Sequence, residues 1–122
     1  PRIIAVLSRH GEINPFLQRI AAEGDCVLKP AMGSGGRGVM LLARSAAGHW
    51  HGSKGEPIPE ESLRQYLSDA LSGAYSLGGK PDEILAQTRI GLHPAFGQMV
   101  PVGIPDIRVI LYRGEPAMAM LR

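Results

Sequence analysis

The stretch CVLKPAMGSGGRGV, residues 26–39, decides the fold. Its apolar start ends in Lys29 and Pro30, four glycines follow within residues 33–38, and a second apolar run occupies residues 39–43. The two apolar runs have the length of short β-strands, and glycines between them are typical of a turn. The stretch therefore predicts a β-hairpin whose tip is a glycine loop.

The glycine loop has the composition of a phosphate-binding loop. Glycines let main-chain N–H groups approach an anion closely, and Arg37 adds positive charge. Lys29 ends an apolar strand, where an ammonium group is costly to bury without an anionic partner. A phosphate would be such a partner. The alternative is a flexible hairpin turn beside a lysine whose charged end reaches solvent, and the loop by itself leaves both interpretations open.

Two other glycine motifs fit less well. Residues 33–38 satisfy G-x-G-x-x-G, but the dinucleotide fingerprint needs a helix after its last glycine. A Rossmann-type oxidoreductase therefore requires residues 39–47 to be helical, whereas their apolar run predicts a strand. The phosphate loop of nucleotide triphosphatases fails because Val39 and Met40 stand where it needs Lys and Ser or Thr.

Periodicity in the rest of the chain predicts two helices and further strands. The first helix is expected to have Asn14 as its cap and Pro15 at its first position. The expected order is strand 2–7, helix 14–23, strands 25–30 and 39–43, helix 59–74, and strands 83–90, 106–112 and 116–121. Residues 45–59 are expected to form a hairpin tip or a loop, and residues 91–105 a long connection. Hairpins mixed with helices predict an α+β fold, an antiparallel sheet with two packed helices.

Length and composition restrict the class of protein. With 122 residues the chain has room for one core, so we expect a single domain or a fragment of one. Its net charge of +2 is too small to predict a nucleic-acid partner. The single cysteine, Cys26, is expected in the core, and no run is long enough to predict a membrane span. A cytoplasmic location is the expectation.

Two blocks of sequence together resemble one family. Residues 26–39 resemble the lysine strand and glycine loop of the ATP-grasp superfamily, and residues 106–109 with 118–122 resemble the strand pair of its glutamate-ligase branch. The chain is most similar to α-L-glutamate ligase-related proteins, relatives of the ligases that add glutamate to a ribosomal protein. The resemblance implies ATP held between two α+β subdomains, a carboxylate activated as an acylphosphate, and attack by an amine, with glutamate one candidate.

The resemblance also implies roles for individual residues. Lys29 would contact the nucleotide on its α-phosphate side, and a main-chain hinge would pair with adenine. The loop residues expected to close over the β- and γ-phosphates are Gly33, Ser34, Gly35, Gly36, Arg37 and Gly38, and the hinge residues are Gln87, Thr88, Arg89 and Ile90. Arg108 and Arg122 would face the transferred phosphate.

The sequence departs from the family pattern in two respects. Relatives usually carry Glu in the hinge strand where this chain has Gln87. The magnesium-binding Glu and Asn of the family lie beyond the stretch ending at Arg122, so no metal ligand is predicted in the chain and the fold is expected to be incomplete at its C-terminus. We therefore expect the chain alone to be inactive as a ligase. A nucleotide- or phosphate-binding module without catalysis is the alternative.

Strand alternation gives an independent argument for the arginines. It places Asp106, Arg108, Ile110 and Tyr112 on one face of their strand, and Ile107, Val109 and Leu111 on an expected core face. If Arg113 pairs with Ala117, Arg108 lies opposite Arg122, and an anion between them would relieve the repulsion. The alternative is an ordinary solvated face. His49 and His51 lack a nearby carboxylate or cysteine and are interpreted as loop residues rather than metal ligands.

Overall fold

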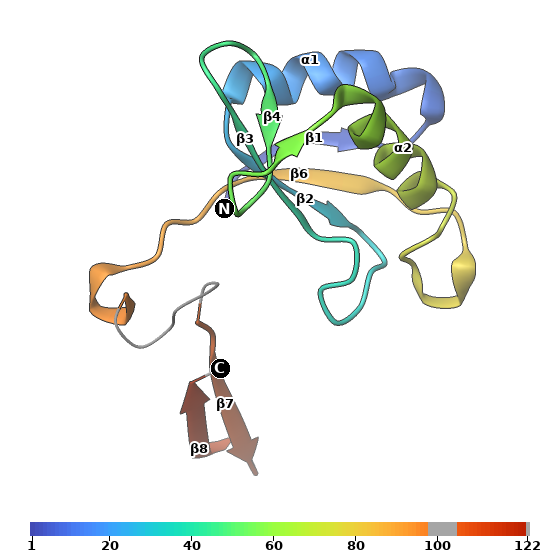
Figure 1. The fold of residues 1–122 in the computed structure, drawn as a ribbon. Helices are drawn as coiled ribbons and strands as arrows, with labels where there is room; N and C mark the ends of the chain where they lie inside the picture. The colour runs from blue at the N-terminus through green and yellow to red at the C-terminus, as the bar shows by residue number, and fades with distance from the viewer. Residues whose placement is uncertain (98–104, 122) are drawn as a thin grey trace. The chain divides into compact units, whose positions relative to one another are not determined.

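The computed structural model describes residues 1–97 and 105–121, which belong to two compact units, Pro1–Arg89 and Ile90–Arg122. The larger unit is α+β, as predicted (Figure 1). Its strands are β1 (Ile3–Leu7), β2 (Cys26–Pro30), β3 (Met40–Arg44), β4 (Trp50–His51), β5 (Pro57–Ile58) and β6 (Ile84–Thr88). Its helices are α1 (Ile13–Glu23) and α2 (Glu60–Leu71), with 3₁₀ turns η1 (His10–Glu12) and η2 (Leu77–Gly79).

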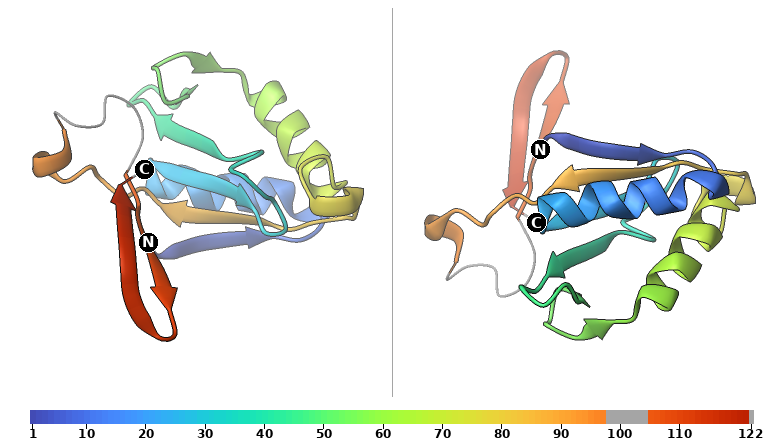
Figure 2. Two further views of the ribbon diagram at one scale, coloured as in Figure 1. Left: turned by 90° about the horizontal axis from the view of Figure 1, so that it is seen from below. Right: turned by 90° about the horizontal axis from the view of Figure 1, so that it is seen from above.

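The strands form one antiparallel sheet in the order β1-β6-β2-β3-β4-β5. The predicted hairpin is confirmed, because β2 pairs with β3 and Cys26 lies opposite Leu42. β6 comes last along the chain in this unit, yet it lies between β1 and β2 (Figures 1 and 2). Since Met40–Arg44 is a strand, the condition for a Rossmann-type fold is not met.

The first helix begins earlier than predicted. The 3₁₀ turn η1 runs directly into α1, which starts at Ile13 with Glu12 as its cap residue and no side-chain capping bond. Asn14 therefore lies inside the helix, and its Oδ1 atom accepts a hydrogen bond from Arg64 at 2.7 Å. The prediction of Asn14 as the cap was wrong, because the preceding turn already supplies helical geometry. No helix among the described residues is long and apolar enough to cross a membrane.

The segment 45–59, predicted as a hairpin tip or a loop, contains two short strands. Trp50 pairs with both Arg44 and Ile58, so β3, β4 and β5 continue the sheet. Its indole is almost fully buried and lies under the Arg44 guanidinium, 5.1 Å from its carbon to the ring centroid. Burial of this large ring stabilises the pairing of β4 with its two neighbouring strands, although the glycines on both sides of Trp50 are typical of a loop. His51 is therefore a strand residue, not a loop residue.

A single hydrophobic core lies between one face of the sheet and both helices. Buried and less buried residues alternate along β2 and β6, so Cys26, Leu28, Ile84 and Ala86 point toward this core. α2 contributes five buried residues, Leu63, Tyr66, Leu67, Ala70 and Leu71, and its first turn carries Glu60 and Glu61. We call the other side of the sheet, which faces away from the helices, the open face.

The smaller unit contains the 3₁₀ turn η3 (Pro94–Phe96) and a hairpin of β7 (Ile107–Tyr112) and β8 (Glu115–Leu121). The turn has two residues, Arg113 and Gly114, and the register shifts between Ile110 and Leu111. Arg108 lies opposite Met120, not opposite Arg122, so the predicted arginine pair was wrong, because the turn is shorter than the pairing of Arg113 with Ala117 assumed. The expected core face is also exposed: Ile107, Val109 and Leu111 are 65%, 50% and 62% accessible.

Candidate functional site

The open face of the larger unit gathers half-buried side chains from neighbouring strands. Val27 of β2 pairs with Gln87 of β6 on one side and with Leu41 of β3 on the other, so the three form a row across the sheet. Lys29 pairs with Leu85 in the adjacent row. All five side chains have intermediate burial, in contrast with the fully buried residues that alternate with them. These five side chains thus form an apolar surface that carries one cation and one amide.

Lys29 lies on this face near the end of β2, four positions before Gly33, the first residue of the glycine loop. It is half-buried, and it makes no ion pair with any residue in the ranges 1–97 and 105–121. An ammonium group in this setting keeps its attraction for an anion, because no carboxylate of the described chain neutralises it. The arrangement is suited to a phosphate or carboxylate ligand.

The glycine loop joins β2 to β3 at the end of the sheet next to Lys29. Gly35, Gly36 and Gly38 have φ of +63°, +75° and +75°, which is the left-handed region that glycine adopts without strain. Their N–H groups donate to no described residue, while Arg37 and Val39 close two tight turns onto Ser34 and Gly36. Free main-chain donors in such turns form an anion-binding nest.

Two side chains that the sequence did not single out hold the ends of this loop. Tyr66 of α2 donates from its hydroxyl to the carbonyl of Gly38 at 2.5 Å. Asp82, which is 5% exposed, accepts from the N–H of Met32, at 3.0 Å through Oδ1. Burial, followed by the neighbouring Tyr75, raises the pKa of Tyr66, so its hydroxyl stays protonated as a donor at neutral pH. In the sequence, the one sign of this role for Tyr66 is that its hydroxyl group occurs among the apolar residues of α2 that face the core.

The four predicted hinge residues have different surroundings. Gln87 has its side-chain Oε1 atom buried with no hydrogen-bond partner among the described residues. Thr88 is engaged by Arg2, which accepts from its N–H and donates to its hydroxyl, both at 2.9 Å. Arg89 is the first residue after β6, and its main chain bonds to no described residue. Ile90 belongs to the smaller unit.

The predicted phosphate-facing arginines belong to the smaller unit. Arg108 is exposed on β7 and pairs with Met120. Arg122 lies outside the described residues. The structure therefore brings Lys29, Gln87 and the glycine loop together within one unit, and it leaves the roles of the two arginines as predictions.

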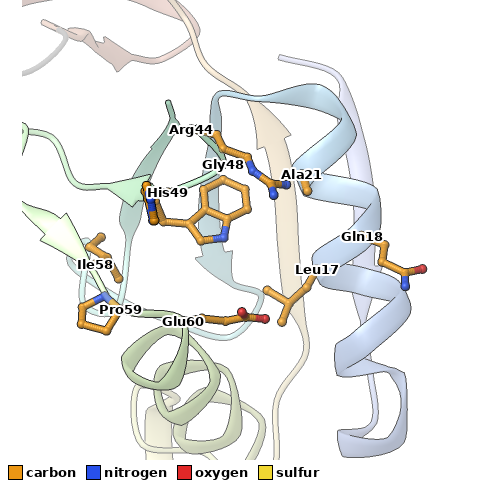
Figure 3. Close-up of a pocket in the computed structure, with 10 residues that line it drawn as sticks. Leu17, Gln18, Ala21, Arg44, Gly48, His49, Ile58, Pro59 and Glu60 are labelled. Carbon is orange, nitrogen blue, oxygen red and sulfur yellow. The ribbon is translucent and has the colours of Figure 1, made fainter. Parts of the chain in front are cut away.

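The larger unit also has a cavity of about 290 Å³ beside α1 and the start of α2 (Figure 3). Arg44, His49 and Glu60 are its charged or titratable lining residues, and Leu17 closes its α1 side. None of its lining residues comes from residues 26–39 or from β6, and Arg44 is at the far end of β3 from the loop. Glu60 is already paired with Arg64 at 3.1 Å. The cavity is thus separate from the open-face site.

No group of three or more His, Cys, Asp or Glu residues that could hold a metal ion occurs within the part of the chain that the structure describes. The residues around the glycine loop are cationic or neutral, and Asp82 uses its carboxylate on main-chain N–H groups. The described residues therefore do not by themselves fit a magnesium site.

The antiparallel sheet covered by two helices on one side, with a lysine strand and a glycine loop beside its open face, defines an ATP-grasp type of domain. A comparison with protein families agrees: the family "Sugar-transfer associated ATP-grasp" matches residues 1–122, and the chain belongs to this family. Membership implies ATP-dependent, ligase-type chemistry with ATP and magnesium. No curated protein and no solved structure matches the chain.

Proposed function

We propose that the Pro1–Arg89 unit binds ATP on the open face of its sheet. The observation that carries this proposal is the position of Lys29, half-buried beside the glycine loop and without an anionic partner among the described residues. Family membership supports ATP as the ligand. In this proposal Lys29 contacts the α-phosphate side, and the loop residues Gly33 to Gly38 close over the β- and γ-phosphates.

The base lies across the row formed by Val27, Leu41 and Gln87. Two aliphatic side chains give the apolar surface that a purine ring requires, and the pairing of their strands supports this placement. The buried Oε1 atom of Gln87 has no partner among the described residues, so an amino group on the base would satisfy an acceptor that otherwise costs free energy. The main chain of Arg89, which bonds to no described residue, would add a further contact.

The proposed reaction is the joining of a carboxylate and an amine, with a glutamate-ligase-like substrate pair. A carboxylate oxygen attacks the γ-phosphorus of ATP, the bond from that phosphorus to the β–γ bridging oxygen breaks, and ADP leaves. The amine nitrogen then attacks the acyl carbon, inorganic phosphate leaves, the nitrogen loses a proton, and an amide remains. Arg108 and Arg122 are assigned to the oxygens of the transferred phosphate, since planar guanidinium groups bind such oxygens with two hydrogen bonds.

A nucleotide-binding module without catalysis is the second candidate. It is favoured by the lack of a metal-holding cluster among the described residues, because phosphoryl transfer depends on metal-held phosphates. The two candidates share the open-face site and differ in turnover.

Titration of the full chain with a non-hydrolysable ATP analogue in a calorimeter tests the site. We expect Lys29→Ala to weaken binding by roughly tenfold or more, the effect of losing one charge-assisted contact. Lys54→Ala is the matched control, since Lys54 is an exposed lysine of the same unit. Equal affinity for the wild type and Lys29→Ala would refute the proposed site.

Release of ADP in the presence of candidate carboxylates and amines separates the two candidates. Amide formation with stoichiometric ADP would exclude the non-catalytic module. In an active protein we expect Arg108→Ala to reduce turnover by about a hundredfold while analogue affinity changes much less, as for groups that act in the transition state. An unchanged turnover would remove Arg108 from the reaction.

A further inference from the structure

The first end of the glycine loop is fixed to the segment between α2 and β6. Met32 directly precedes Gly33, and its N–H donates to both carboxylate oxygens of Asp82, at 3.0 and 3.1 Å. The same carboxylate accepts from the N–H of Glu83 at 2.7 Å. The carbonyl of Met32 accepts from Leu77 at 3.2 Å. Both main-chain groups of the residue before the loop are therefore held by the same connection, through the buried Asp82 and the main chain of Leu77.

The second end of the loop is fixed to α2 itself. The hydroxyl of Tyr66 donates to the carbonyl of Gly38 at 2.5 Å, and Tyr66 is 7% exposed within the core. Its ring lies 5.7 Å from that of Tyr75, centroid to centroid, and Tyr75 packs directly against Gly38. The hydroxyl of Tyr75, in contrast, bonds to no residue that the structure describes.

The tip between these two ends has no comparable support. Gly35 and Gly36 have nothing within 4 Å of an added Cβ position, and residues Ser34 to Arg37 are exposed. Only short turns within the loop connect them. The loop is thus anchored at Met32 and Gly38, and its phosphate-facing donors lie on the span between the anchors.

We infer that Tyr66 and Asp82 are positioning residues that set the conformation of the glycine loop for the phosphates of its ligand. This inference rests on the proposed function and deepens it, because the anchors act on the phosphate-binding loop and not on the face that holds the base. The anchor contacts come from α2 and the connection after it, so the core of the larger unit is coupled directly to the loop.

The test compares Tyr66→Phe with Tyr75→Phe. Both variants lose a hydroxyl and keep a ring, but only Tyr66 bonds to the loop. We expect Tyr66→Phe to weaken binding of the ATP analogue about three- to tenfold, the usual effect of one lost hydrogen bond. Binding of adenosine, which has no phosphates, should stay within about twofold of the wild type for both variants, as expected for a change remote from the base.

A second variant pair covers the other anchor. Asp82→Asn keeps an acceptor oxygen for Met32 or Glu83, whereas Asp82→Ala keeps none, so the asparagine should restore part of the affinity lost in the alanine variant. Amide hydrogen exchange of residues 32–38 in the free protein is expected to quicken in Tyr66→Phe and Asp82→Ala, with Tyr75→Phe unchanged.

Wild-type analogue affinity and unchanged exchange in Tyr66→Phe would overturn the inference while the Lys29 site stands. An equal loss for the ATP analogue and adenosine would overturn it too, since that pattern indicates general destabilisation. If Lys29→Ala binds the analogue as well as the wild type, the proposed site itself fails, and this inference fails with it.

Discussion

The ring of Tyr75 lies against Gly38 so closely that a Cβ atom added to this glycine would stand 2.6 Å from Tyr75 Cγ. Gly38 also has φ of +75°, so its conformation and its surroundings both exclude a side chain. Gly35 shares the left-handed conformation, with φ of +63°, but nothing lies within 4 Å of its added Cβ position. The two glycines therefore separate the effect of backbone strain from that of crowding.

Replacement of each glycine by alanine should give unequal losses of stability. Gly35→Ala is expected to cost about 1–2 kcal/mol, the strain of a left-handed alanine. Gly38→Ala should cost about 1–3 kcal/mol more, because its methyl group displaces Tyr75 or Pro30. Urea unfolding of both variants measures the difference in unfolding free energy. Equal losses would show that the Tyr75 ring moves aside at no cost.

Burial decides the effect of truncating a leucine. Leu67 of α2 is fully buried, whereas Leu77 is 69% exposed. We expect Leu67→Ala to lower the free energy of unfolding by about 2–5 kcal/mol through lost burial and a cavity. Leu77→Ala should change it by no more than about 0.5 kcal/mol. Denaturant titration of both gives the comparison, and a large effect at Leu77 would contradict the described exposure.

The raised pKa of the Cys26 thiol predicts that the folded protein loses stability at alkaline pH. Burial, followed by the charges of Asp25 and Glu23, raises the pKa of this thiol from 9.0 to about 12. Because the folded pKa lies above the unfolded value, the thiol's contribution is complete below pH 9 and is lost as the pH rises toward 12. Within that window the slope from one group approaches about 1.4 kcal/mol per pH unit.

Unfolding titrations of the wild type and Cys26→Ala between these pH values isolate the thiol. The alanine variant is less stable at neutral pH but should lose stability less steeply above pH 9. Parallel pH profiles would mean that the thiol ionises equally in both states. Tyr66, whose pKa is also raised by burial, affects both proteins alike.

Gln87 should have opposite effects on stability and on ligand preference. Its buried Oε1 atom has no partner among the described residues, so Gln87→Leu is expected to raise the stability of the free protein by about 1 kcal/mol. If Oε1 accepts from the amino group of adenine, the variant should lose roughly three- to tenfold of any preference for ATP over ITP. Gln65→Leu is the control, because that amide is exposed and bonded to Asp69 at 2.8 Å. A loss of stability in Gln87→Leu would contradict the first expectation.

Local sequence patterns identified most of the regular elements and the loop. The hairpin around the glycine loop and the helix α2 were predicted because the apolar runs of strands and the three- and four-residue spacing of a helix are visible in the sequence. The start of α1 was missed because neither the preceding 3₁₀ turn nor the helix itself begins with a side-chain capping bond. The strand at Trp50 was missed because it has only two residues, and the glycines on both sides of it favour the prediction of a loop.

The β7–β8 register shows a different limit. The prediction that Arg108 faces Arg122 assumed a turn of Gly114 to Pro116, but the turn is Arg113 and Gly114, with Arg113 at φ of +50°. A change of turn length moves every pair along the hairpin, and the sequence offered no apolar asymmetry strong enough to fix it. Arg108 faces Met120 as a result.

The sequence by itself determined that Lys29, four closely spaced glycines and a strand–loop–strand unit occur together, since these are neighbours along the chain. It could not place Gln87 beside Val27, because the insertion of β6 between β1 and β2 is a long-range pairing. Nor could it show that Asp82 and Tyr66 hold the two ends of the loop, 50 and 28 residues away from their partners Met32 and Gly38. Such contacts exist only after the core has packed α2 against the sheet, so only the tertiary structure decides which polar groups meet at the loop.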